Sequence, residues 1–85
     1  MPGADDLSLY YFPACPYCRR VLRAMDELEL ALELRDIRAE PQRRAELVAA
    51  RGRGTVPVLR ISGEGEDEWL PESLDIVAYL KKRFG

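Results

Sequence analysis

The sequence predicts an α/β domain in the order β-α-β-α-β-β-α, with a four-stranded mixed sheet flanked by three helices. Two observations lead to this fold class. The 85 residues are 47% hydrophobic and 33% charged, which is ordinary for one small globular domain. The hydrophobic residues also switch along the chain between alternation, typical of strands, and the spacing of amphipathic helices. We therefore expect a single domain over residues 7–85, preceded by a flexible tail over residues 1–6.

The first strand and helix are predicted from an aromatic-rich run and the proline that follows it. Residues 7–12 are almost entirely apolar, which indicates a buried strand. A helix should run over about residues 16–29, because Pro16 suits the first helical position, where no N–H is needed. One helical face is predicted to be buried, and it carries Val21, Leu22, Met25 and Leu28.

The middle of the chain predicts a second strand and a second helix. Residues 32–37 alternate between apolar and polar side chains, as a strand does. Residues 41–51 form a helical pattern with Pro41 at its start and Gly52 just past its end. The apolar face of this helix is thin, so we expect it to pack loosely.

The C-terminal part predicts a hairpin and a last helix. Residues 56–61 form a third strand, and a glycine-containing turn leads to a short return strand over residues 68–70. The last helix is predicted to carry Leu74, Val77, Leu80 and Phe84 on one side. The first two strands should be parallel because a helix connects them, and the hairpin strands antiparallel.

Charge and composition exclude several classes of function. The 13 basic and 15 acidic side chains give a formal net charge of −2. The chain therefore lacks the net positive charge that favours binding to nucleic acid or to an anionic membrane. No apolar run approaches the roughly 20 residues of a membrane span, and no secretory signal is visible. We therefore expect a cytoplasmic monomer.

Histidine is absent, and the only two cysteines are Cys15 and Cys18. The absence of histidine removes Ser-His and Cys-His catalysis and every His-ligated metal site. Two cysteines fall short of the four ligands of a structural zinc site, so no metal is expected. The C-x-x-C spacing instead indicates a redox-active pair.

The position of the cysteines predicts a different role for each. Cys15 stands where the first helix begins, and the free N–H groups and positive dipole end of a helix favour a thiolate. Cys18 lies one turn further on, within reach of a mixed disulfide at Cys15. We therefore expect Cys15 to be the nucleophile and Cys18 the resolving thiol. Two inert buried cysteines, or a metal shared between two chains, are the alternatives.

The segment Cys15-Pro16-Tyr17-Cys18, together with Gly54-Thr55-Val56-Pro57-Val58-Leu59, resembles the dithiol glutaredoxins. The resemblance covers about residues 7–84 and implies the thioredoxin fold. It also implies glutathione-dependent reduction of protein disulfides and of glutathione mixed disulfides, and thus a part in electron transport and cell redox homeostasis. Glutathione would be the reductant, and disulfide or glutathionylated proteins the substrates.

By this resemblance, the glutathione-binding residues include Tyr17, Thr55, Val56 and Pro57. Pro57 would be a cis-proline facing the two sulfur atoms, and Val56 would offer its backbone N–H and C=O to the cysteinyl part of glutathione. Phe12 departs from the family, since many glutaredoxins have a lysine there that binds the glycine carboxylate. The replacing cation would be Arg53, Arg43 or Arg51.

A second departure precedes the last helix, where residues 70–80 are similar to the N-terminal domain of glutathione transferases. In that family a Glu-Ser pair at the helix start holds the γ-glutamyl group. This implies that Ser73, predicted as the N-cap, binds the carboxylate and that Glu72 faces the ammonium group.

Two other functions remain open at this point. One is a transferase-like glutathione-binding module without disulfide turnover, including one that bridges a [2Fe–2S] cluster with Cys15 as a ligand. The other is a thioredoxin-like hydrogen donor that a thioredoxin reductase recycles, which the loss of the lysine at Phe12 favours.

Overall fold

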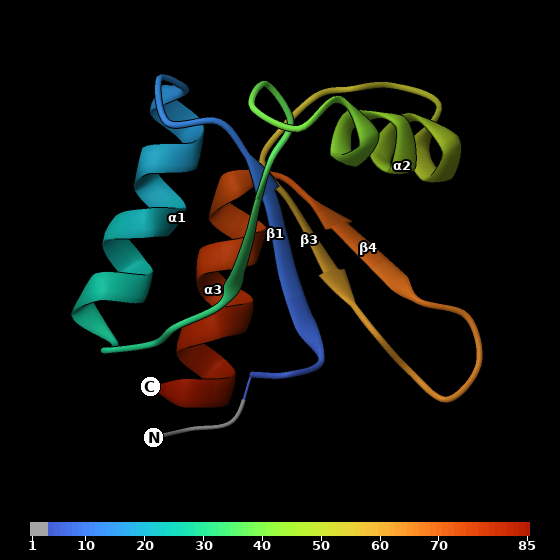
Figure 1. The fold of residues 1–85 in the computed structure, drawn as a ribbon. Coiled ribbons are helices and arrows are strands. Elements are labelled where there is room, and N and C mark those ends of the chain that lie inside the picture. Colours follow the sequence, from blue (N-terminus) through green and yellow to red (C-terminus); the bar gives the residue numbers. More distant parts are fainter. Residues whose placement is uncertain (1–3) are drawn as a thin grey trace.

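The computed structural model describes residues 4–85 and contains four strands and three helices (Figure 1). Their order confirms the predicted β-α-β-α-β-β-α arrangement. The elements are β1 (Leu7–Tyr11), α1 (Pro16–Glu27), β2 (Glu33–Asp36), α2 (Pro41–Arg51), β3 (Val58–Ile61), β4 (Glu68–Pro71) and α3 (Ser73–Phe84).

The four strands form one mixed sheet in the order β2-β1-β3-β4. β1 and β2 are parallel and β3 and β4 are antiparallel, as predicted. β3 also pairs antiparallel with β1. Helices α1 and α3 lie side by side on one face of the sheet, and α2 lies on the other face (Figure 1).

Two hydrophobic clusters hold these layers together. The larger cluster packs α1 and α3 against the sheet and is centred on Leu9, Leu59 and Ile76. The smaller cluster lies beneath α2 and consists of Tyr10, Ile37, Leu47 and Val58. Leu47 is the one residue of α2 that is buried, which agrees with the loose packing predicted for this helix.

The Tyr10 hydroxyl is the centre of a polar network on the α2 face of the sheet. It accepts hydrogen bonds from Arg35 (2.7 Å) and Arg60 (3.2 Å) and donates one to Glu46 (3.0 Å). The Tyr10 ring also packs against Trp69, with 5.4 Å between the ring centroids. Since Glu46 belongs to α2, this network ties the loosely packed helix to the sheet.

Some boundaries differ from the predicted ones. Helix α1 ends at Glu27 instead of residue 29, because Leu28 forms the C-cap and Glu29 adopts a φ of 53°. β3 begins at Val58 instead of Val56, since Pro57 has no N–H to donate to a ladder.

The predicted inner face of α3 is wrong at Leu74, whose side chain is 66% exposed. The buried residues of this helix are Ser73, Ile76 and Leu80, which follow the i, i+3 and i+7 spacing of one stripe. The stripe thus begins at a serine, and Leu74 is rotated about 100° away from it.

The predicted flexible tail lies partly outside the described residues, which begin at Ala4. Ala4 is buried in the larger cluster, and Asp6 pairs with Arg83 near the end of α3 (2.9 Å). These contacts bring the first described residues close to the C-terminus (Figure 1). Within residues 4–85, none of the helices has both the length and the apolar composition needed to cross a membrane.

Candidate functional site

The two cysteines lie at the start of α1, as predicted. Cys15 is the N-cap residue, and its Sγ accepts a hydrogen bond from the Cys18 backbone N–H at 3.4 Å. Pro16 occupies the first helical position, where its missing N–H costs nothing. Both cysteines are free thiols. The local sequence therefore directs backbone hydrogen-bond donors at one sulfur atom, that of Cys15.

The two thiols differ in their surroundings. Cys18 is completely buried, whereas 6% of the surface of Cys15 is exposed to solvent. Burial raises the pKa of the Cys18 thiol to about 12, even though its interaction with the Phe12 backbone opposes this; the neighbouring Cys15 adds to the increase. Cys18 is therefore protonated at neutral pH, and the sulfur atom nearer the surface is that of Cys15.

The Val56–Pro57 peptide bond is cis, which confirms the cis-proline expected at Pro57. Val56 lies across from the cysteines, with its carbonyl oxygen 4.0 Å from Cys15 Sγ. The backbone N–H of Val56 has no hydrogen-bond partner within residues 4–85. An extended peptide that passes this point could pair with Val56 and bring its own sulfur close to Cys15.

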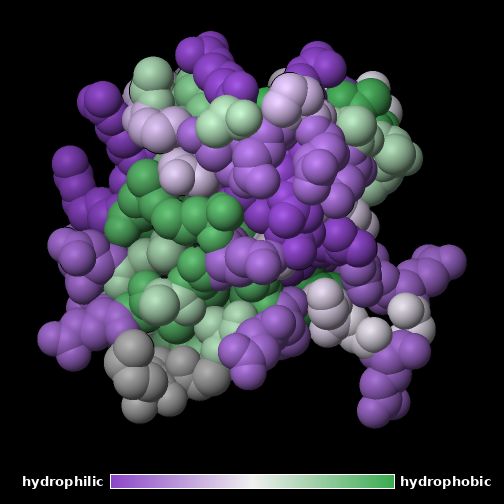
Figure 2. Space-filling view, in the orientation of Figure 1, coloured by the Kyte–Doolittle hydropathy of each residue, from purple (hydrophilic) through white to green (hydrophobic). Residues whose placement is uncertain are grey.

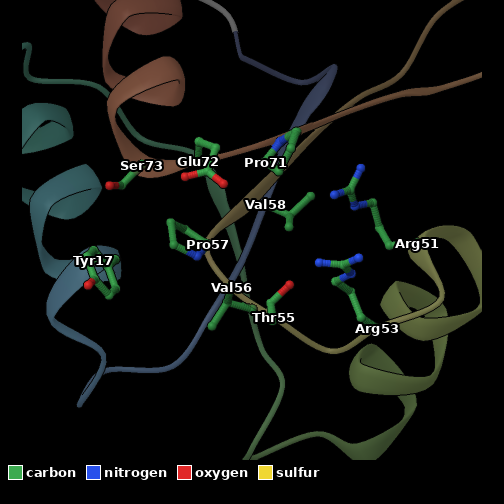
Figure 3. A pocket seen from close by; sticks show the side chains of 10 residues that line it. All are labelled: Tyr17, Arg51, Arg53, Thr55, Val56, Pro57, Val58, Pro71, Glu72 and Ser73. Atoms are coloured by element: carbon green, nitrogen blue, oxygen red, sulfur yellow. The ribbon is translucent and has the colours of Figure 1, made fainter.

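A pocket of about 260 Å³ opens beside the cis-proline (Figure 3). All the residues predicted from the resemblances to bind glutathione line this one pocket: Tyr17, Thr55, Val56, Pro57, Glu72 and Ser73. The two cysteines do not line it, but Cys15 adjoins it through Val56. The roles given to these residues stay predictions.

One end of the pocket is the N-terminus of α3. Glu72 is the N-cap residue and has a φ of 72°, whereas Ser73 is the first residue of the helix. The prediction of Ser73 as the N-cap is therefore wrong. Its side chain is turned inward instead, and Ser73 Oγ accepts a hydrogen bond from Arg20 Nη1 at 3.2 Å. This end combines the free N–H groups of a helix with a nearby cation.

The opposite end of the pocket is cationic, because Arg51 and Arg53 line it (Figure 3). Arg51 Nε is buried and has no hydrogen-bond partner within residues 4–85, so one donor in this wall is unpaired. Arg43, the third cation considered from the sequence, does not line the pocket and pairs with Glu40 and Glu46.

Phe12 packs into the smaller hydrophobic cluster, which explains why an aromatic residue suits a place where a lysine was expected. Arg38 stacks on its ring, with the guanidinium carbon 3.8 Å from the ring centroid. A cation is thus present beside this position even though residue 12 is uncharged.

The sequence analysis missed three residues at the site. Val58 and Pro71 line the pocket and are register partners in β3 and β4. Val58 directly follows Val56-Pro57 and Pro71 directly precedes Glu72-Ser73, so their positions in the sequence could have indicated that they lie at the site. Arg20 gave no local signal in the sequence, because the residue that it contacts, Ser73, lies 53 positions away.

Comparisons with known proteins point to one family. Residues 9–85 match the family described as "Glutathione S-transferase, N-terminal domain". No curated protein matches the chain.

Several solved structures are similar to the chain. A trimeric glutathione transferase from Leishmania is 25% identical with a TM-score of 0.75, and the match covers 93% of this chain and 18% of that one. Glutathione transferase Omega 2C from Trametes versicolor is 25% identical with a TM-score of 0.75, covering 94% and 39%. A glutathione transferase from Bombyx mori is 30% identical with a TM-score of 0.73, covering 100% and 38%. The chain thus spans well under half the length of these proteins.

Proposed function

This chain belongs to the family of glutathione S-transferase N-terminal domains, and we propose that it binds glutathione beside Cys15 and catalyses thiol–disulfide exchange. The substrates would be protein disulfides and glutathione mixed disulfides. One observation carries the proposal: the pocket that joins the Glu72–Ser73 end to the two arginines passes the Val56 backbone, whose carbonyl oxygen is 4.0 Å from Cys15 Sγ.

The Glu72–Ser73 end suits the γ-glutamyl part of glutathione. Its carboxylate would meet the first N–H groups of α3, where a helix N-terminus favours an anion. Arg20, which donates to Ser73 Oγ, adds a positive charge at this place. The carboxylate of Glu72, an exposed residue that lines the same pocket, would face the ammonium group.

The arginine end suits the glycine carboxylate. Arg51 and the exposed Arg53 both offer hydrogen-bond donors to the pocket. Arg51 Nε has no hydrogen-bond partner within residues 4–85. A guanidinium group can hold a carboxylate through two parallel hydrogen bonds. These arginines would therefore replace the lysine that glutaredoxins have at the position of Phe12.

The proposed reaction begins at the Cys15 thiolate, which attacks the glutathione sulfur of a glutathionylated protein. A bond forms between Cys15 Sγ and that sulfur, the original disulfide bond breaks, and the substrate thiolate leaves and takes up a proton. A second glutathione, as its thiolate, then attacks the glutathione sulfur bound to Cys15. This step releases oxidised glutathione and returns the Cys15 thiolate. One free glutathione is therefore consumed for each mixed disulfide reduced, and the other half of the oxidised glutathione comes from the substrate.

Cys18 is poorly suited to resolve the intermediate rapidly at neutral pH. The thiolate is the attacking species in such exchanges, and burial holds the pKa of Cys18 at about 12. We therefore propose that glutathione, and not Cys18, resolves the mixed disulfide with small substrates.

The decisive experiment measures glutathione-dependent reduction of a glutathione mixed disulfide, coupled to NADPH through glutathione reductase. Wild type and Cys18→Ser should turn over, and Cys15→Ser should not. Turnover retained in Cys15→Ser would overturn the proposal. Glutathione binding to Cys15→Ser, measured by calorimetry, separates a loss of chemistry from a loss of the site.

A second candidate is glutathione conjugation without disulfide turnover, and the family match favours it. In that case Cys15 or its helix N-terminus would stabilise the thiolate of bound glutathione instead of attacking a disulfide. Conjugation of glutathione to an aromatic electrophile, retained in Cys15→Ser and without activity on mixed disulfides, would establish this alternative.

A further inference from the structure

The outer edge of β2 has no strand partner within residues 4–85, because β2 is the first strand in the sheet order β2-β1-β3-β4. Leu34, in the middle of this strand, is 42% exposed and is one of three large hydrophobic residues exposed in the described part of the chain. Hydrophobic side chains gather on the surface along α1 and β2, to the left of centre in Figure 2. An open, partly apolar strand edge of this kind is prone to pair with another strand.

The backbone groups that face outward follow from the pairing of β2 with β1. The Ile37 N–H donates to the Tyr11 carbonyl at 2.9 Å, so the backbone of Ile37 points toward β1. Because orientation alternates along a strand, Arg35 and Glu33 also point toward β1. The N–H and C=O groups of Leu34 therefore point away from the sheet, toward solvent.

The side chains of β2 are self-complementary about Leu34. Glu33 and Arg35 flank it, pair with each other within one chain (2.6 Å), and share the α2 face of the sheet, since their register partners are Ser8 and Tyr10. In an antiparallel dimer the two pairs would form one network of four alternating charges. We propose that two copies of the chain pair antiparallel through β2, with the two-fold axis at Leu34. The N–H and C=O of Leu34 would bond those of the partner's Leu34, and Glu33 would lie opposite the partner's Arg35 in both halves.

The neighbouring registers are disfavoured by charge. A shift in one direction places Glu33 opposite the partner's Glu33, and a shift in the other direction places Arg35 opposite the partner's Arg35. Like charges directly opposite each other destabilise an antiparallel pair, whereas opposite charges stabilise it. One register therefore satisfies both the outward-pointing backbone of Leu34 and the charges on either side of it.

The proposed pairing leaves the pocket free, because no residue of β2 lines it. The paired sheet would have eight strands, since each copy contributes four in the order β2-β1-β3-β4. On the α1 side, the exposed Leu34 side chains of the two copies would come together. Only a four-residue strand pairs in each copy, so we expect a reversible dimer that forms at about 0.1–1 mM protein.

The experiment is sedimentation equilibrium of the chain over this range of concentrations. Wild type should approach the mass of a dimer, and Leu34→Lys should lower the association constant at least about tenfold, because two lysines then meet at the axis. Leu74→Lys is the matched control, since Leu74 is also exposed but belongs to α3. A wild type that stays monomeric at about 1 mM, or a dimer that only Leu74→Lys disrupts, would overturn the proposal.

A charge-complementation arm tests the two-fold axis itself. Leu34→Lys and Leu34→Glu should each be monomeric alone, and an equal mixture of the two should form a heterodimer, because only the mixture places opposite charges opposite each other. Both variants alter an exposed side chain, and circular dichroism checks that each is folded. A mixture that remains monomeric while wild type dimerises would exclude a register in which Leu34 faces its own copy.

Discussion

Replacing Tyr10 with phenylalanine removes one oxygen atom from a fully buried residue that joins three elements. Its hydroxyl connects Arg35 of β2, Arg60 of β3 and Glu46 of α2. The phenylalanine ring would keep the packing against Trp69. The substitution therefore isolates the hydrogen bonds of the network from the hydrophobic contribution of the ring.

The expected loss is about 2 kcal/mol of unfolding free energy. A hydrogen bond to a charged group contributes roughly 1.5–3 kcal/mol, and a partner left buried without any bond adds a further cost. Here the partners keep other bonds, since Arg35 still pairs with Glu33 (2.6 Å) and Arg60 with Asp67 (2.7 Å). The loss is thus well below the sum of three such bonds, and it should lower the melting temperature by about 10 °C in a domain of this size.

Urea denaturation followed by the fluorescence of Trp69, the single tryptophan, measures this loss. Tyr11→Phe is the matched control, because the Tyr11 side chain packs against the larger hydrophobic cluster, on the opposite face of the sheet from the network. We expect the control to change the unfolding free energy by less than about 0.5 kcal/mol. An equally small change in Tyr10→Phe would refute the view that this network stabilises the fold.

Three further predictions concern a buried thiol, an unpaired arginine and an ion pair. Because burial raises the pKa of Cys18 from 9.0 to about 12, the unfolded chain loses this proton before the folded one does, and stability should fall as the pH rises above about 9. The slope should reach at most about 1.4 kcal/mol per pH unit, and urea denaturation at several pH values should show it reduced in Cys18→Ala. Arg51→Ala should weaken glutathione binding about five- to tenfold in calorimetry, whereas Arg23→Ala, which changes an exposed arginine of α1, should not. The hydrogen bond from Arg83 lowers the pKa of Asp6. The contribution of this partly exposed pair to stability is therefore present above pH 3.8 and lost as the pH falls. Asp6→Asn should lower the unfolding free energy at pH 7 by at most about 1 kcal/mol, measured by thermal or urea unfolding.

The parts of the structure that the sequence predicted well depend on local signals. The order of elements follows from periodicity, the start of α1 from Pro16, and the end of α2 from Gly52, which adopts a φ of 76°. The cis-proline and part of the pocket lining were expected from the family resemblances carried by short motifs at Cys15, Val56 and Glu72. The segments that carry these motifs are far apart in the sequence, and the fold brings them together around one pocket.

The parts that the sequence did not predict depend on contacts between distant residues. Ser73 looked like an N-cap because serine often is one, but Arg20 from α1 holds its side chain inward. The tyrosine network likewise joins residues 25 to 50 positions apart, and no spacing rule links them. Hydrophobic periodicity also failed at Leu74, because the inward stripe of α3 begins with a polar residue.

The two ends of the pocket are anchored with different strength, and this has a consequence for function. The Glu72–Ser73 end belongs to α3, which packs against α1 in the larger hydrophobic cluster. Cys15 is the N-cap residue of α1, so Cys15 and this end of the pocket are anchored by the same packed helices. The arginine end consists of Arg51, the last residue of α2, and Arg53 just after it. Leu47 and the hydrogen bond from the Tyr10 hydroxyl to Glu46 hold α2 to the sheet. Loosening α2 should therefore weaken the hold on the glycine carboxylate while leaving the sulfur and the cis-proline in place. If the proposed function is right, Tyr10→Phe should raise the KM for glutathione more than it lowers kcat, whereas a change at Cys15 should abolish kcat.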